Sequence, residues 1–267
     1  MPLPTVRHLA ALGSSFAAGP GIRPVADRRA MRSRKNYPHL LSERLGARLT
    51  DLTVSGATTA TILHAPQRLL GVGFPPQLSQ LPADVDLVTV TAGGNDLSYI
   101  GRVLLSAYAS RLSQRSITRR LGRRLGRGGV PEPDRSEIDA AADGLAAIVD
   151  GVRGRAARAR VLLVGYLTVL EPDATYTLDA RFDPDTRDAL RKIADALNEA
   201  FTQAVASTGA DFVDVGCSSG GHGLGSADPW IRGFSPRHLA SSFHPNLAGM
   251  HAVTDAVIDH LATTETD

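Results

Sequence analysis

Four short polar stretches of the sequence carry the residue types of an acyl-transfer site. "GSSFAAG", starting at Gly13, holds two adjacent serines, and "SGATT" starts at Ser55. "GGND" starts at Gly93, and "FHPN", starting at Phe243, holds a histidine. In acyl transfer a serine attacks the acyl carbon, a histidine takes the serine proton, and N–H groups of the backbone and of a carboxamide hold the oxyanion. The sequence therefore offers a nucleophile, a base and oxyanion donors.

Short apolar runs precede three of these stretches and alternate with helical patterns. The runs cover residues 6–12, 48–54, 86–92, 160–166 and 211–215, and the helical patterns cover 37–47, 137–157, 184–207 and 246–262. Continuous apolar runs are typical of parallel strands that are buried on both faces. The alternation predicts an α/β fold, a three-layer α/β/α sandwich with a parallel sheet. Ligands of such sheets bind beyond the carboxyl ends of the strands, where we expect the four stretches to meet.

Bulk properties limit the classes of protein that the chain can belong to. Its 267 residues, 43% of them hydrophobic, favour a single domain over 1–267. The net charge of +2 gives no indication of a nucleic-acid partner. Cys217 is the single cysteine, which excludes an internal disulfide and a zinc–cysteine cluster. No apolar run approaches the roughly 20 residues of a membrane span, and no signal peptide is evident, so we expect a cytoplasmic protein. An exported protein without its leader would have a similar sequence.

The four stretches, in this order, resemble the motif blocks of the SGNH hydrolases, also called GDSL esterases and lipases. The resemblance spans nearly the whole chain. It implies a flavodoxin-like sheet and a serine esterase or lipase that forms an acyl-enzyme, with no metal and no cofactor. The first block of the family is usually Gly-Asp-Ser, which places Ser15 at the nucleophile and Ser14 where the aspartate normally stands.

The resemblance also assigns the oxyanion hole and the base. The backbone N–H groups of Ser15 and Gly56 and the side chain of Asn95 match the oxyanion donors, and His244 matches the base. Gly56 has no side chain, so its N–H can approach an oxyanion closely. Pro245 biases His244 toward an extended conformation, from which the imidazole can project into the crevice.

One acid of the family pattern is missing. Members commonly carry aspartate three residues before the histidine, and here that position is Ser241. Some members orient the histidine with a main-chain carbonyl instead, so we predict that the carbonyl of Ser241 orients His244. Asp228, the nearest upstream acid, is the rival. Loss of the orienting acid also leaves open a second hypothesis, a catalytically degenerate binding module that kept the fold.

A second serine motif competes with the first. "GCSSG", residues 216–220, matches the Gly-x-Ser-x-Gly nucleophile elbow at Ser218, but that motif requires a following helix and a glycine-rich stretch follows here. We therefore expect His222 and Trp230 to line the crevice and Ser218 to take no part in the chemistry. A nucleotide-binding role lacks both a Walker A loop and a Gly-x-Gly-x-x-Gly turn.

The segment 97–130 differs from the rest of the chain in charge. It contains eight arginines and no acidic residue. We interpret 101–136 as an insertion or lid whose glycine-rich end is mobile. Its loosely helical apolar positions, together with the basic charge, suggest contact with an anionic membrane surface, and a solvated arginine-rich helix is the plain alternative. The expected substrates are acyl lipids or other apolar acyl esters. Phospholipids, thioesters and acetylated carbohydrates stay open within the family.

Overall fold

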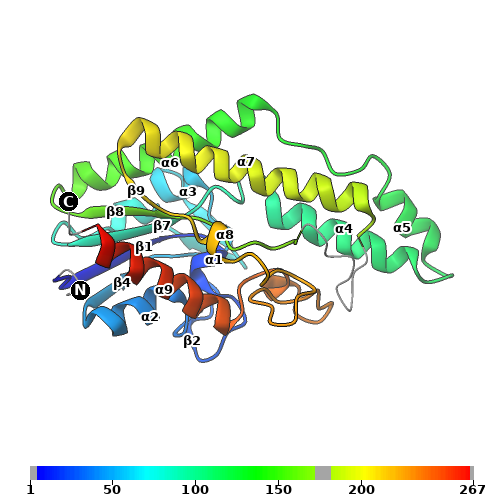
Figure 1. Ribbon diagram of the computed structural model, residues 1–267, viewed down its shortest axis with the longest axis horizontal. Helices are drawn as coiled ribbons and strands as arrows, with labels where there is room; N and C mark the ends of the chain where they lie inside the picture. The colour runs from blue at the N-terminus through cyan, green and yellow to red at the C-terminus, as the bar shows by residue number, and fades with distance from the viewer. Residues whose placement is uncertain (1–4, 172–181, 265–267) are drawn as a thin grey trace.

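A parallel five-stranded sheet forms the centre of the computed structural model, which describes residues 5–171 and 182–264. Its strand order is β4-β1-β7-β8-β9 (Figure 1). The strands are β1 (His8–Gly13), β4 (Arg48–Asp51), β7 (Leu87–Thr91), β8 (Arg160–Val164) and β9 (Asp211–Val213). Because β1 lies between β4 and β7, the loops that follow these three strands meet at one edge of the sheet.

Helices cover both faces of the sheet. On one face α2 (Tyr37–Leu45) packs against α9 (Leu247–Thr263). On the other face lie α3 (Thr59–Leu63), α6 (Arg135–Arg155) and α7 (Pro184–Thr208), as Figure 1 shows. The strands β1 and β7 are buried along their whole length, as the continuous apolar runs predict. The predicted α/β class and three-layer order are confirmed.

Polar side chains begin the long helices. Asn36, Asp134, Asp183 and Asn246 each accept a hydrogen bond from a backbone N–H in the first turn of α2, α6, α7 and α9 respectively. Such caps satisfy amide groups that have no partner inside the helix, and each stabilises a helix by about 1 kcal/mol. The cap at Asn246, two residues after His244, fixes where α9 begins.

Several small elements were not evident from the sequence. They are α1 (Ser15–Ala18), the hairpins β2 (Val25–Asp27) with β3 (Arg32–Ser33) and β5 (Gln67–Leu69) with β6 (Val72–Phe74), the 3₁₀ turns η1 (Gln77–Gln80) and η2 (Leu239–Ser241), and α8 (Val215–Ser218). Short elements of this kind depend on long-range contacts more than on local periodicity.

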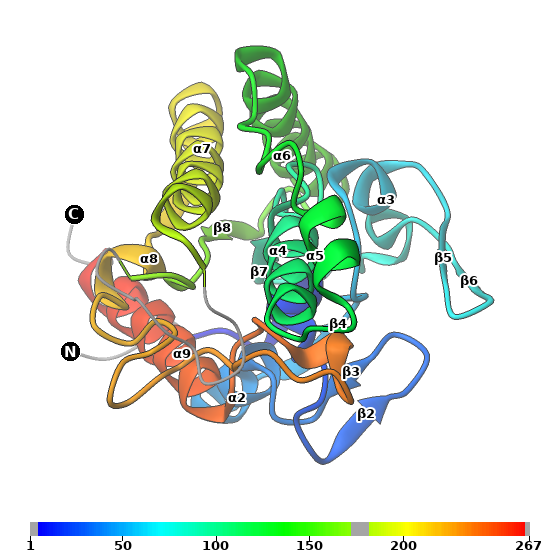
Figure 2. The ribbon, with the colours of Figure 1, turned by 90° about the vertical axis from the view of Figure 1, so that its right-hand side faces the viewer.

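The arginine-rich segment forms two packed helices, α4 (Tyr99–Ser113) and α5 (Arg119–Leu125), which we call the arm. Figure 2 shows the arm in front of the sheet when the molecule is viewed from the right of Figure 1. Gly122, one of the glycines in the segment expected to be mobile, has a packing role, because a Cβ there would lie 2.4 Å from the backbone nitrogen of Ser113 in α4. In the described residues, no helix is long and apolar enough to cross a membrane.

Candidate active site

The chain turns sharply between β1 and the two serines. Gly13 has φ +152°, and a Cβ there would lie 2.6 Å from the carbonyl oxygen of Thr91, so only glycine fits. Ser14 N–H then donates to the same carbonyl at 2.9 Å. Ser15 follows as the first residue of α1 and is buried. The turn thus lifts Ser15 out of the strand and into the site.

His244 lies directly against Ser15. Its Nε2 is 2.8 Å from Ser15 Oγ, and its Nδ1 is 2.8 Å from the carbonyl oxygen of Ser242. A carbonyl only accepts, so Nδ1 carries the proton and Nε2 is free to accept the serine O–H. This is the tautomer that a general base for Ser15 requires.

The orienting carbonyl belongs to Ser242, which corrects the prediction of Ser241. Ser241 ends η2, and its backbone and hydroxyl groups both donate to the carbonyl of His238. Ser242 is extended and Phe243 has φ +61°, so the chain reverses and aims the Ser242 carbonyl at the imidazole. The family spacing points three residues upstream and contains no signal for this one-residue shift.

Asp228, the rival acid, faces another histidine. Its carboxylate lies 3.5 Å from His222 Nδ1, and its backbone carbonyl lies 2.8 Å from the same nitrogen. The His222 ring stacks on Trp230 with centroids 3.7 Å apart. Asp228, His222 and Trp230 therefore form a separate cluster. Among the residues that the structure describes, a carbonyl and no carboxylate is bonded to the His244 ring.

Two further blocks bring the candidate oxyanion donors to the same edge. Gly56, after β4, has φ +81°, and its N–H donates to no acceptor within the described chain. Asn95, after β7, uses one N–H of its carboxamide to donate to Ala57 O at 2.8 Å, which leaves the second N–H for a ligand. Asp96 accepts hydrogen bonds from the backbone and hydroxyl of Thr59. The second and third blocks are thereby held to each other.

Three buried or half-buried residues that sequence reasoning missed support the blocks from behind. The Tyr166 hydroxyl lies 3.1 Å from Ser14 Oγ and accepts from Gly94 N–H. Gln77 bonds both the N–H and the carbonyl of Gly13, and Gln67 donates to the carbonyl of Ser55. These contacts join residues 12 or more positions apart in the chain, and no local pattern marks them.

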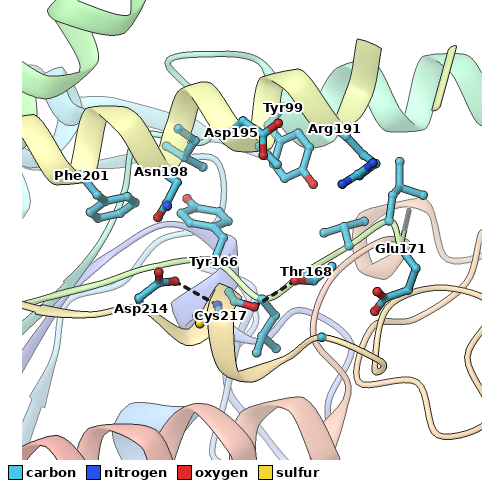
Figure 3. Close-up of a pocket in the computed structure, with 17 residues that line it drawn as sticks. Tyr99, Tyr166, Thr168, Glu171, Arg191, Asp195, Asn198, Phe201, Asp214 and Cys217 are labelled. Atoms are coloured by element: carbon cyan, nitrogen blue, oxygen red, sulfur yellow. Dashed lines mark hydrogen bonds between the residues drawn. The ribbon is translucent and has the colours of Figure 1, made fainter. Parts of the chain in front are cut away.

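Tyr166 also forms one wall of a cavity of about 390 Å³ between the end of β8, α7 and α8 (Figure 3). Neither Ser15 nor His244 is among the described residues that line it. Ser218, the competing serine, lies at the end of α8 and its hydroxyl donates to Val215 O at 3.2 Å. His251 and His260 line the same surface pocket as Ser218, but within residues 5–171 and 182–264 no histidine forms a hydrogen bond with its hydroxyl, in agreement with the expectation that Ser218 takes no part in the chemistry.

Burial controls the protonation of the candidate base. Burial lowers the pKa of His244 to about 4; the hydrogen bond to the Ser242 carbonyl opposes this shift, and the nearby Arg232 guanidinium adds to it. An ordinary histidine titrates near 6.5. His244 is therefore neutral, and able to accept a proton, well below neutral pH.

The pH dependence of turnover follows from this shift. A general base works only when deprotonated, so kcat/KM should fall as pH drops through the pKa of His244 in the free enzyme. We expect the acid limb to have its midpoint near pH 4, measured with a soluble ester in a pH-stat, with circular dichroism to establish folding at each pH. Asp228→Asn should leave this limb in place, because Asp228 faces His222. A midpoint near 6.5 would contradict the account.

A flavodoxin-like sheet with a hydrogen-bonded serine and histidine at its carboxyl edge is the arrangement of a serine hydrolase. The chain belongs to the GDSL-like lipase/acylhydrolase family, whose pattern matches residues 11–252. It is 35% identical to Lipase 2 of Streptomyces coelicolor over 272 residues, which cover 97% of this chain and 86% of that protein. It is an ester hydrolase, as are the relatives named lipase and esterase.

Solved structures agree with the fold. An extracellular lipase from Streptomyces rimosus superposes with a TM-score of 0.69 at 24% identity, and the match covers 94% of this chain and 98% of that one. Phospholipase A1 from Streptomyces albidoflavus superposes with a TM-score of 0.73 at 21% identity and the same coverage. At these identities the likeness concerns the fold alone.

Proposed function

We propose that the chain hydrolyses carboxylic esters of apolar acyl chains, with Ser15 as nucleophile and His244 as general base. The observation that carries this proposal is the hydrogen-bonded series from Ser15 Oγ through the imidazole to the Ser242 carbonyl. The N–H groups of Ser15, Gly56 and the Asn95 side chain are the proposed oxyanion donors. A degenerate binding module would have no need for a buried base held in the reactive tautomer.

Each half of the reaction moves one proton through His244. As Ser15 Oγ attacks the ester carbon, Nε2 takes the hydroxyl proton, and the oxyanion donors hold the charge that develops on the carbonyl oxygen. The imidazolium gives that proton to the departing alkoxide, which leaves as the alcohol, and the acyl group stays on Ser15 as an ester. Water then attacks the acyl carbon and His244 takes a proton from it. As the bond from the acyl carbon to Ser15 Oγ breaks, the imidazolium returns this proton to Oγ and the carboxylic acid leaves.

The imidazolium of this site differs from that of an ordinary triad in its counter-charge. The Ser242 carbonyl offers only a dipole, and in the described part of the chain no carboxylate is bonded to the ring, so the oxyanion that forms on the substrate is a counter-charge for the imidazolium. Proton transfer to and from His244 therefore depends on how strongly the oxyanion donors bind the oxyanion.

An ester panel tests the substrate class. Purified protein is offered 4-nitrophenyl esters from acetyl to palmitoyl, together with a thioester, a phospholipid and an acetylated sugar. We expect kcat/KM to rise from acetyl to a longer acyl chain and to exceed that for the acetylated sugar. A maximum at acetyl would contradict the apolar acyl preference while leaving ester hydrolysis in place.

The arm supports a second element of the proposal, contact with an anionic lipid surface. Five of the nine exposed large apolar side chains in the described chain lie on or between its helices: Leu105, Tyr108, Ile117, Leu121 and Leu125. Ile117, between α4 and α5, is 96% exposed. The arm also stands close to the site, because Tyr108 contacts Phe234, and Phe234 stacks on Phe243 beside His244. Exposed apolar groups among arginines suit the headgroup region of an anionic bilayer.

Sedimentation with vesicles tests this contact. Vesicles of phosphatidylcholine alone are compared with vesicles that also contain phosphatidylglycerol, at low and physiological salt. We expect binding to the anionic vesicles, weakened about 30-fold by Arg120→Gln with Arg124→Gln, since each basic residue contributes about 1 kcal/mol. Arg28→Gln with Arg29→Gln, on the exposed β2–β3 turn, is the matched control and should bind normally. Equal binding to both vesicle types would contradict the proposal.

A further inference from the structure

Arg232 lies beside His244 and has no anionic partner among the described residues. Its backbone N–H donates to His244 O at 2.9 Å, and its carbonyl accepts from Phe243 N–H at 2.9 Å. Residues 231 and 245 form an antiparallel bridge next to this pair. The arginine is therefore fixed directly opposite the segment that carries His244.

The guanidinium lies between two loops that border the Ser15–His244 pair. Nη1 lies 3.5 Å from the position that a Cβ of Gly21 would take, and Gly21 belongs to the loop after α1. The Cβ of Ser241, in the loop before His244, lies 2.6 Å from the same position. A side chain at Gly21 would therefore collide with Ser241. Because Gly21 is exposed and has no side chain, a ligand can approach the guanidinium from this side.

The side chain of Arg232, unlike its backbone, forms no hydrogen bond with the described residues. Its Nε is buried and has no hydrogen-bond partner, and no carboxylate of residues 5–171 or 182–264 forms an ion pair with the guanidinium. Burial lowers the pKa of Arg232, yet arginine stays charged. Burying part of a charge without a counter-charge is costly, and an anion that paired with it would remove that cost. Guanidinium binds phosphate and carboxylate through paired N–H donors.

We propose that Arg232 binds an anionic group, a phosphate or a carboxylate, carried by the ester substrate a few atoms from the scissile bond. The site then selects for charge on the substrate as well as for an acyl chain. This inference rests on the proposed function, since it assigns a specificity residue to the same reaction. The arm is also positively charged, so it would attract the same negatively charged substrates.

Two pairs of small soluble esters separate charge from every other property. The first pair is 1-butyrylglycerol and 1-butyrylglycerol 3-phosphate, and the second is diethyl glutarate and monoethyl glutarate. All four are too small to form a lipid surface, so the arm does not bear on the result. The first pair tests a phosphate on the alcohol side and the second tests a carboxylate on the acyl side.

We expect the wild type to have a lower KM for the anionic member of at least one pair. Arg232→Gln should raise that KM about 10–100-fold, the range for loss of a charge-assisted hydrogen bond, and should leave kcat and the neutral ester within about twofold. Arg232→Lys keeps the charge and should retain part of the preference. Arg237→Gln, an exposed arginine five residues along the same loop, is the matched control and should behave as wild type.

Two results would contradict different claims. If the wild type hydrolyses both members of each pair with equal KM, or Arg232→Gln raises KM for neutral and anionic esters alike, the role of Arg232 is wrong and ester hydrolysis stands. If the wild type hydrolyses neither the neutral nor the anionic esters, nor the 4-nitrophenyl panel, the proposed function itself is wrong.

Discussion

Ser15→Ala should lower kcat by about 10⁶-fold, the largest effect expected of any single substitution in this protein. The substitution removes the hydroxyl that lies 2.8 Å from His244 Nε2, so the acyl-enzyme cannot form. Single-turnover kinetics on a 4-nitrophenyl ester measures the loss. Circular dichroism should be unchanged, because in the described residues the hydroxyl of Ser15 bonds the His244 ring and no backbone group.

Ser218 and Ser14 serve as controls for Ser15→Ala. Ser218→Ala should leave turnover within about twofold, since its hydroxyl only bonds a carbonyl of its own short helix. Ser14→Ala removes the bond to Tyr166 and should lower turnover by about tenfold at most, the value of one neutral hydrogen bond. A large loss in Ser218→Ala with activity retained in Ser15→Ala would move the reaction to the helix that follows β9 and would contradict the account.

Asn95→Ala should lower kcat by about 10²–10³-fold with little change in KM. The free N–H of its carboxamide is expected to strengthen its bond as negative charge develops on the substrate oxygen, so its removal raises the barrier more than it weakens binding. Steady-state kinetics on a soluble ester separates kcat from KM. A rise in KM at constant kcat would show instead that Asn95 binds the ground state.

The same carboxamide also donates to Ala57 O, so stability must be measured beside activity. Losing that bond should cost about 1 kcal/mol of unfolding free energy, too little to unfold the protein. Asn198→Ala, at an exposed asparagine of α7 that lines the cavity behind Tyr166, is the matched control and should keep full activity.

Most of the sheet could be predicted from the sequence because its three central strands, β1, β7 and β8, are almost fully buried and form continuous apolar runs. The run at 86–92 differs from β7 (Leu87–Thr91) by one residue at each end, and the pattern at 184–207 differs from α7 (Pro184–Thr208) by one residue. The arm was harder, because its apolar residues divide between the core and solvent: Val103 is fully buried, whereas Leu121 is 52% exposed. Apolar residues that face both the core and the solvent do not recur at one helical period.

The position of the four blocks at one edge of the sheet could be predicted, because each lies in a loop that must contact the same substrate. The pairing of Ser15 with His244, 229 residues apart, follows from the fold and not from spacing. The orienting carbonyl could not be assigned to the right residue, since the φ of +61° at Phe243 decides which carbonyl faces the ring and side-chain sequence does not encode it. Arg232 was missed because nothing in its neighbours shows that it lacks a counter-charge. The cytoplasmic location stays a prediction.

Labelling with a fluorophosphonate tests the central claim most directly. The reagent reacts only with a serine whose hydroxyl is deprotonated by a neighbouring base as it attacks, so the label reports the working nucleophile. Peptide mass spectrometry of the labelled protein should place the single adduct on Ser15, and His244→Ala should abolish it. An adduct on Ser218 or Ser14, or no adduct on a protein that hydrolyses esters, would contradict the assignment of Ser15 and His244.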